Sequence, residues 1–103
     1  MIEFDGGYLT IARISGDPKE LVEGYLGGLE VMNGVGHDHG LRVHVGATTP
    51  DGLLLINLWP SAEGSESAAR DPRRGAQIAA TGLRPEDISR EHHEVAQAVI
   101  FGG

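Results

Sequence analysis

The stretch "LRVHVGATTPDGLLLINLWPS", residues 41 to 61, decides the fold. Two strand-like runs flank a short Pro50-Asp51-Gly52 turn, which predicts a β-hairpin. Successive side chains of a strand point to opposite faces, so Asn57 and Trp59 share one face of the second run. The other face of that run is leucine and isoleucine throughout. One face of the hairpin is therefore apolar, and the other ends in an amide and the only tryptophan of the chain.

The residues before the hairpin predict a strand and then a helix. Residues 7–16 form a β-branched run bounded by glycines, which is typical of a strand. Asp17 can cap a helix, Pro18 suits its first turn, and Glu20 completes a capping box. Apolar residues then recur at intervals of three and four as far as Met32. We expect one helix that ends near Asn33-Gly34, followed by a loop up to residue 40.

The residues after the hairpin predict further helix and a last strand. The alanine-rich segment 62–82 favours helix, and Pro72 divides it into two pieces. The second piece is expected to begin at an Asp71 cap and to end at Gly82. A fourth strand is predicted over residues 88–95, and residues 96–101 either extend it or form a short helix.

The order strand, helix, strand, strand, helix, strand predicts an α+β fold of the ferredoxin-like βαββαβ type, as a single domain over residues 1–103. Two helical segments would cover one face of a four-stranded antiparallel sheet. The chain has 16 glycines and few aromatic residues, so its core is thin. We therefore expect a homodimer formed through the open sheet face, a dimeric α+β barrel that encloses a cavity between two sheets.

Composition narrows the choice of partners. A formal net charge of -7 disfavours nucleic acid and anionic membrane surfaces. No apolar run reaches the roughly 18 residues of a transmembrane helix, and no leader segment is recognisable. The absence of cysteine excludes thiol chemistry and disulfides. These features suggest a cytoplasmic protein whose partner is a small molecule or another protein.

The register of the hairpin determines which side chains meet. The apolar Val43 and Val45 match the apolar face of the second strand only if paired residue numbers sum to an odd value. A pocket-like set then shares the opposite face: Arg42, His44, Leu55, Asn57 and Trp59. If the valines pack under the helices, this set lies on the open face of the sheet. An apolar wall with a few convergent polar groups is typical of a ligand pocket.

The segments "VHVGATTPDGLLLINLWPS" and "GLRPEDI" resemble the antibiotic-biosynthesis monooxygenase group of dimeric α+β barrel proteins, over roughly residues 8–95. The resemblance implies oxidation of polycyclic phenols by dioxygen without a cofactor, in a cavity that Asn57 and Trp59 would line. Other members of this group cleave haem, and many have no known activity. The haem-cleaving members need a histidine on the second helix. Residues 62–82 contain none, which makes haem degradation a weaker alternative.

Cofactor-free oxygenation needs a base, a stabilised anion and a dry pocket for a flat aromatic ligand. His44 is the candidate base, because histidine ordinarily titrates near neutral pH. Asn57 could hold a phenolate or peroxide oxygen, Arg42 could stabilise the anion, and Trp59 could stack on a ring. One of the adjacent His92 and His93 should face the cavity as a second candidate base, and we choose His93.

Structural roles are the alternatives for the same residues. Trp59 could fill a dimer core, and Asn57 could satisfy a strand end or bond a neighbouring side chain. Arg42 could be a solvated edge residue, with His44 an ordinary strand residue. The protein would then be a non-catalytic ligand-binding or structural dimer.

The remaining histidines raise the question of a metal site. His37, Asp38 and His39 lie together, but no third or fourth ligand is evident. His92 and His93 are adjacent, so in a strand they point to opposite faces. We predict no metal and no cofactor.

Overall fold

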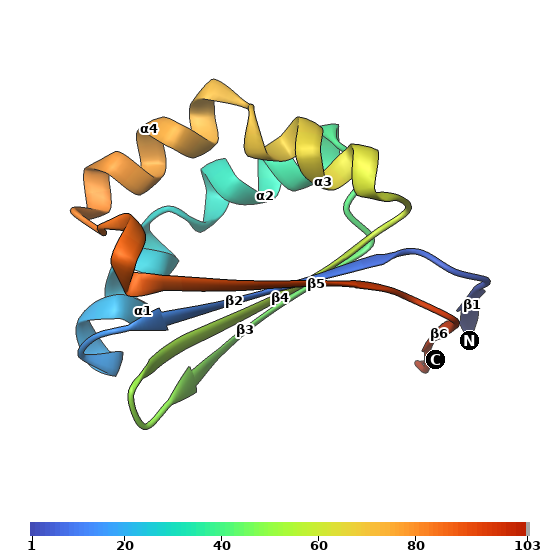
Figure 1. The fold of residues 1–103 in the computed structure, drawn as a ribbon, viewed down its shortest axis with the longest axis horizontal. Coiled ribbons are helices and arrows are strands. Elements are labelled where there is room, and N and C mark those ends of the chain that lie inside the picture. Colours follow the sequence, from blue (N-terminus) through green and yellow to red (C-terminus); the bar gives the residue numbers. More distant parts are fainter. Residues whose placement is uncertain (103) are drawn as a thin grey trace.

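The computed structural model describes residues 1–102 and contains a four-stranded antiparallel sheet with all helices on one face (Figure 1). In chain order the elements are β1 (Ile2–Phe4), β2 (Tyr8–Ser15), α1 (Pro18–Gly27), α2 (Leu29–Asp38), β3 (Val43–Thr49), β4 (Gly52–Trp59), α3 (Ala62–Ala69), α4 (Pro72–Thr81), the 3₁₀ turn η1 (Pro85–Asp87), β5 (Ile88–Glu94) and β6 (Ala98–Ile100). The large sheet has the strand order β3-β4-β2-β5. This is the predicted ferredoxin-like α+β architecture. No helix of the described residues is long and apolar enough to cross a membrane.

The hairpin has the predicted register. Val43 lies opposite Leu58 and His44 lies opposite Asn57, so paired residue numbers sum to 101. The central β2 pairs with both β4 and β5, and Thr10 lies between Asn57 of β4 and His92 of β5. The predicted first and fourth strands are therefore confirmed as β2 and β5.

The predicted division of residues 62–82 is confirmed by α3 and α4. The Asp71 carboxylate accepts a hydrogen bond from the Arg73 backbone N–H at 2.9 Å, and Pro72 takes the first position of α4. Gly82 ends that helix with a φ of 73°, a left-handed conformation that glycine adopts without steric cost.

The prediction for residues 17–40 is wrong in two respects. The expected single helix is two helices with a break at Gly28, and the expected loop after Asn33 is the second half of α2. Packing explains the extension, because α2 lies against α4 and brings Val35 into the core with an exposed fraction of 2%. Tertiary burial there outweighs the weak helix propensity of a glycine-rich segment.

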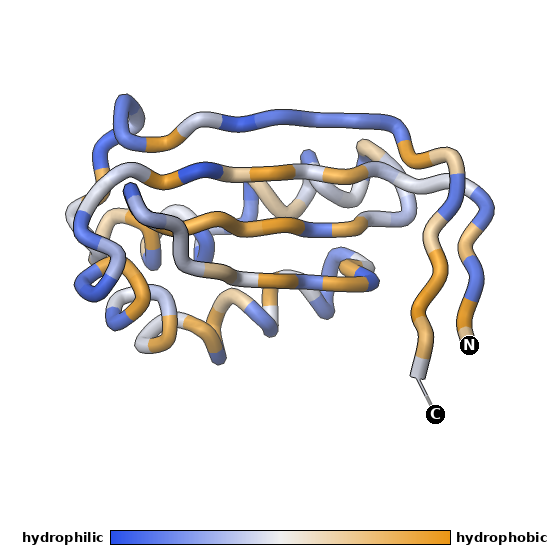
Figure 2. The backbone as a smooth tube through the Cα atoms, turned by 90° about the horizontal axis from the view of Figure 1, so that it is seen from below, coloured by the Kyte–Doolittle hydropathy of each residue, from blue (hydrophilic) through white to orange (hydrophobic). Residues whose placement is uncertain are grey.

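The expectation for the two sheet faces is also wrong. The face that carries His44, Asn57 and Trp59 lies under the helices, and the valines of β3 lie on the open face. The helices settle there because Trp59 offers a large apolar contact, and it packs with Val35 and Ala68. We call the open face, which Figure 2 shows from the side away from the helices, the outer face.

The two ends of the chain form a separate two-stranded ribbon. Ile2 pairs with Ile100 and Phe4 pairs with Ala98, so β1 and β6 are antiparallel neighbours. The ribbon bends away from the helix layer at one end of the large sheet (Figure 1). Residues 96–101 thus neither extend β5 nor form a helix, and the sequence analysis missed β1 as the partner of β6.

Candidate functional site

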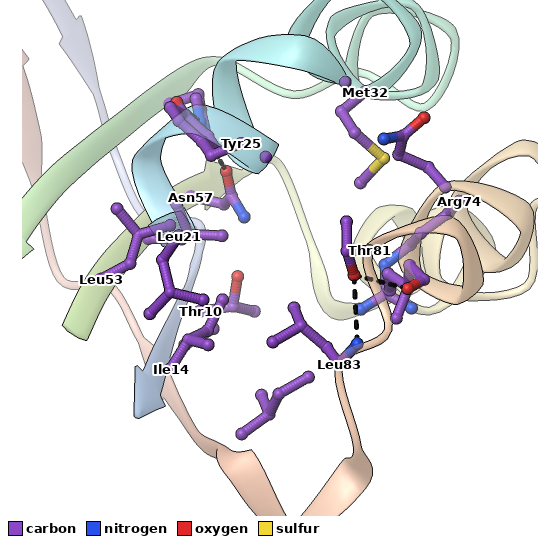
Figure 3. Close-up of a pocket in the computed structure, with 18 of the residues that line it drawn as sticks. Thr10, Ile14, Leu21, Tyr25, Met32, Leu53, Asn57, Arg74, Thr81 and Leu83 are labelled. Atoms are coloured by element: carbon purple, nitrogen blue, oxygen red, sulfur yellow. Dashed lines mark hydrogen bonds between the residues drawn. The ribbon is translucent and has the colours of Figure 1, made fainter. Parts of the chain in front are cut away.

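A cavity of about 630 Å³ lies between the large sheet and the helices, within the size range of small-molecule sites. Strands β2 and β4 supply one wall, and α1, α2 and α4 supply the others (Figure 3). Most of the wall is apolar, with Leu21, Met32, Leu53 and Leu55 among its residues. The cavity belongs to one chain, so the predicted enclosure between two sheets is not how it forms.

Three polar side chains meet at the β3–β4 side of this cavity. Tyr25 of α1, His44 of β3 and Asn57 of β4 form a continuous hydrogen-bonded chain. The Tyr25 hydroxyl oxygen is 2.6 Å from His44 Nε2, and His44 Nδ1 is 2.6 Å from Asn57 Oδ1. His44 and Asn57 are direct cross-strand partners, so the hairpin register fixes their contact.

The partners of His44 define its hydrogen-bonding state. Asn57 Oδ1 is only an acceptor, so His44 Nδ1 carries the hydrogen of that bond. In the neutral ring Nε2 is then the acceptor, and the Tyr25 hydroxyl donates to it. The amide NH₂ of Asn57 remains free to donate a hydrogen bond into the cavity, on the side seen in Figure 3.

The Tyr25 ring packs against Gly46 of β3 and so comes within hydrogen-bond distance of His44. A Cβ atom added to Gly46 would lie 2.6 Å from both Cζ and the hydroxyl oxygen of Tyr25, so the ring lies directly on the β3 backbone. Burial raises the pKa of Tyr25 above its ordinary value. The phenol is therefore protonated near neutral pH and acts as a donor to His44.

Trp59 lies between the core and the cavity. Its exposed fraction is 5%, and its indole N–H donates to Thr10 Oγ1 at 3.4 Å. It packs with Val35 and Ala68, while part of its surface lines the cavity. Trp59 thus fills the core of its own chain, which corrects the alternative of a dimer core.

Two residues expected in the pocket lie elsewhere. The Arg42 guanidinium is 4.3 Å from the ring centre of Phe4 and does not line the cavity. Phe4 ends β1, and the turn between β1 and β2 places its ring beside Arg42. His93 pairs with Leu9 and points to the outer face, where it approaches Glu91. His92 is the member of the pair that lines the cavity, with its ring centre 5.7 Å from that of Tyr8.

Tyr25, Arg74 and Arg90 are among the cavity residues that sequence reasoning missed. Tyr25 belongs to the apolar stripe that predicts the first helix, although a buried tyrosine needs a partner for its hydroxyl, which is a usable signal. Arg74 of α4 and Arg90 of β5 also line the cavity. Nothing in the local sequence around either arginine points to a cavity, since their placement depends on how α4 and β5 pack.

The histidines outside the cavity contact carboxylates in place of a metal ion. His39 Nε2 is 3.0 Å from Asp71 Oδ2, and the Arg73 guanidinium contacts both Asp71 and Asp38. Residues 1–102 contain no group of three or more histidines, cysteines and carboxylates arranged to hold a metal ion.

Comparison with known proteins yields structures only. No family model matches the chain, and no curated protein matches it. Among solved structures, a protein of unknown function from Nitrosomonas europaea has a TM-score of 0.72 at 14% identity, with 96% of this chain and 98% of that chain covered. A dimeric ferredoxin-like protein of unknown function from Jannaschia sp. CCS1 has a TM-score of 0.69 at 10% identity, with 86% and 99% covered.

An enzyme is also among the similar structures. The monooxygenase from the gene ActVA-Orf6 of Streptomyces coelicolor, in complex with the ligand Nanaomycin D, has a TM-score of 0.68 at 17% identity, with 94% of this chain and 93% of that chain covered. At these identities the likeness concerns the fold. The chain therefore has the fold of dimeric ferredoxin-like proteins and of antibiotic-biosynthesis monooxygenases, which the sequence resemblance implied.

Proposed function

We propose that this protein binds a flat aromatic phenol in the cavity and oxidises it with dioxygen, without a cofactor. The observation that carries the proposal is the hydrogen-bonded chain of Tyr25, His44 and Asn57 at one side of an apolar cavity. The similarity of the fold to a ligand-bound monooxygenase supports it.

The hydrogen-bonded series of Tyr25, His44 and Asn57 can take a proton from a bound phenol. The Tyr25 oxygen can accept the hydroxyl proton of a bound phenol while Tyr25 gives its own proton to His44 Nε2. The resulting imidazolium keeps its hydrogen bond from Nδ1 to Asn57 Oδ1. Tyr25 is thus a relay with a raised pKa, and His44 is the proton acceptor.

The phenolate then reacts with dioxygen. Electrons pass from the phenolate to dioxygen, and a peroxide forms at a ring carbon that still carries hydrogen. The free N–H of Asn57 can hold the peroxide oxygen by a hydrogen bond. The His44 imidazolium returns its proton through Tyr25 to the peroxide. The O–O bond then breaks as the hydrogen of the same ring carbon leaves as a proton, which releases water and leaves a quinone. One oxygen atom is in the new carbonyl and the other in water, so phenol and dioxygen balance quinone and water without an added reductant.

A non-catalytic binding role is the second candidate. The three polar groups satisfy one another in the absence of ligand, which also suits a pocket that only orients a hydroxyl group. Haem degradation remains weaker, because no histidine occurs in α3 or α4. Consumption of dioxygen with a bound phenol distinguishes the oxidation from the non-catalytic binding role.

We also propose a homodimer. The register places Leu9, Ile11 and Ile56 on the outer face, and Arg13 follows them on β2. The helices lie on the other side of the sheet (Figure 1). Val45 on the outer face has an exposed fraction of 46%. A second copy of the chain would cover this apolar surface, and the similarity to a dimeric protein supports that arrangement.

The test is oxygen consumption with anthrone and 1-naphthol, measured together with binding by calorimetry. We expect uptake of one dioxygen per phenol oxidised, and a loss of about a hundredfold in kcat/KM for Tyr25→Phe. The matched control is Tyr8→Phe, which removes the same atom from a half-buried tyrosine outside the chain of hydrogen bonds. Binding without oxygen uptake would leave only the non-catalytic role. Activity of Tyr25→Phe equal to that of the unmodified protein would contradict the proton relay through Tyr25.

A further inference from the structure

Arg74 is the cationic side chain that α4 brings to the cavity. It is half-buried and lines the wall across from Tyr25 and Asn57 (Figure 3). Arg90 of β5 lines the same cavity. The charged residues of the cavity lining are thus Arg74, the exposed Arg90, and the carboxylates Asp17, Glu20 and Glu91. None of these carboxylates forms an ion pair with Arg74 or Arg90.

Neither guanidinium has a carboxylate partner within residues 1–102. The adjacent Arg73 differs sharply, since it binds Asp71 at 2.8 Å and Asp38 at 2.9 Å. The chain has 15 acidic residues against 8 lysines and arginines, so potential partners are not scarce.

The surroundings of Arg74 disfavour its charge. Burial and, to a lesser extent, the nearby positive charge of Arg90 lower the pKa of Arg74 from its ordinary value. Partial burial removes some of the water around this cation, so a ligand of opposite charge would gain by binding it. A guanidinium presents its N–H groups in a fork that matches a carboxylate.

We propose that Arg74, assisted by Arg90, binds a carboxylate of the ligand, so that the ligand is an aromatic hydroxy acid. This inference rests on the proposed binding of a phenol in the same cavity. Because Arg74 and Tyr25 lie on different sides of the cavity, the carboxylate and the hydroxyl group are at opposite ends of the ligand. A ligand with the two groups on adjacent ring carbons cannot reach both.

The experiment is a calorimetric titration of the protein with four naphthalene probes at pH 7. They are 6-hydroxy-2-naphthoate, its uncharged amide, 3-hydroxy-2-naphthoate and 2-naphthol. We expect the first to bind about tenfold more tightly than each of the others, as one charge-assisted contact would provide. This comparison needs no variant.

Variants then assign the effect to Arg74. Arg74→Gln should abolish the preference for the acid over the amide, whereas Arg70→Gln, on an exposed arginine at the end of α3, should retain it. Arg74→Met keeps much of the aliphatic stem and should behave like Arg74→Gln. Both Arg74 variants should melt at or above the temperature of the unmodified protein, because an unpaired charge is removed; a lower melting temperature would indicate a structural role and contradict the inference.

The outcomes distinguish the two proposals. Equal affinity for the acid and the amide would overturn the carboxylate site and leave the phenol site standing. No binding of any probe would overturn both. Tight binding of inorganic phosphate that Arg74→Gln abolishes but that leaves the affinity for 6-hydroxy-2-naphthoate unchanged would also overturn the assignment, because it would show that the anion site at Arg74 is separate from the aromatic cavity.

Discussion

At the scale of single residues, the contact between Tyr25 and His44 depends on a glycine, Gly46. The Tyr25 ring rests on the backbone of Gly46, which lies two residues beyond His44 in β3. Any Cβ at this position would push the phenol away from Nε2 of the histidine. The glycine is thus part of the site although it has no chemistry of its own.

Gly46→Ala should disconnect Tyr25 from His44. We expect oxygen uptake to fall to the level of Tyr25→Phe, while the free energy of unfolding falls by about 1 kcal/mol or less, since a half-buried tyrosine can shift. Activity and thermal unfolding measured on the same sample check both parts. Unchanged activity would show that the relay does not need the observed contact. Gly24→Ala is the control, because a Cβ there meets nothing within 4 Å.

Only some of the contacts in the site could be predicted from the sequence. The contact between His44 and Asn57 could be predicted, because the apolar Val43 and Val45 fix the register of the hairpin. The placement of His92 rather than His93 in the cavity could not be predicted. The segment "EHHE" is polar on both faces, and only the pairing of His92 with Thr10 of β2 determines which histidine faces the cavity. The face of the sheet that the helices cover could not be predicted either, because leucines occur on both sides of β4.

At the scale of elements, capping residues and glycines set the boundaries of α4. The helix begins after the Asp71 cap and ends at Gly82, and both ends could be predicted from the sequence because their reasons are local. The full length of α2 could not, since its last turn exists through the burial of Val35 against Trp59 and Ala68. Local signals predict helix ends, and packing decides how far a helix continues.

Substituting the two glycines at Gly75 and Gly82 should have opposite effects. Gly75 lies inside α4 with open space where a methyl group would stand, so Gly75→Ala should raise the free energy of unfolding by about 0.5–1 kcal/mol. Gly82 has a positive φ, so Gly82→Ala should lower it by about 1 kcal/mol. Urea unfolding followed by circular dichroism measures both. Two changes of the same sign would contradict this account of α4.

Asp71 links α4 to the end of α2 through its ion pairs. Hydrogen bonds from Arg73 and then His39 hold the pKa of Asp71 well below its ordinary value. A carboxylate with a lowered folded-state pKa stabilises the fold above the unfolded-state pKa of about 4, and the contribution is lost as the pH falls below it. The link between these helices should therefore weaken in acid.

Asp71→Asn tests this link, because asparagine keeps the helix cap and removes the charge. We expect the variant to melt roughly 5 °C below the unmodified protein at pH 7, with the difference shrinking as the pH falls from about 4 toward 2. Asp51→Asn in the exposed hairpin turn is the control and should show a smaller difference. A difference for Asp71→Asn that does not change between pH 7 and pH 2 would assign the effect to the cap alone.

At the scale of the whole molecule, the two faces of the sheet differ in what covers them. The inner face with the helices forms the cavity, and the outer face presents apolar side chains from β2, β3 and β4. The β5 tube is hydrophilic along most of its length (Figure 2). The register places Glu91 and His93 on the outer face, where Glu91 approaches Arg13 of β2. Self-association and ligand binding should therefore be separable by substitution.

Val45→Asp should dissociate the proposed dimer. Val45 is already 46% exposed, so the folded monomer should tolerate the charge, while a buried carboxylate would disfavour the interface. Light scattering on a sizing column measures the mass. Val31→Asp on α2 is a matched control with an exposed fraction of 41% and should remain dimeric. A monomeric unmodified protein, or loss of the dimer in both variants, would contradict the assignment of the outer face.

The ribbon of β1 and β6 has a practical consequence for engineering. Because Ile2 lies opposite Ile100, the two ends of the described chain leave the molecule at one corner (Figure 1). A short peptide could join them, and new ends could be opened in the Pro50-Asp51 turn between β3 and β4. In such a circular permutant the two strands that carry His44 and Asn57 would no longer be consecutive, so its assembly would show whether sheet pairing alone aligns the site.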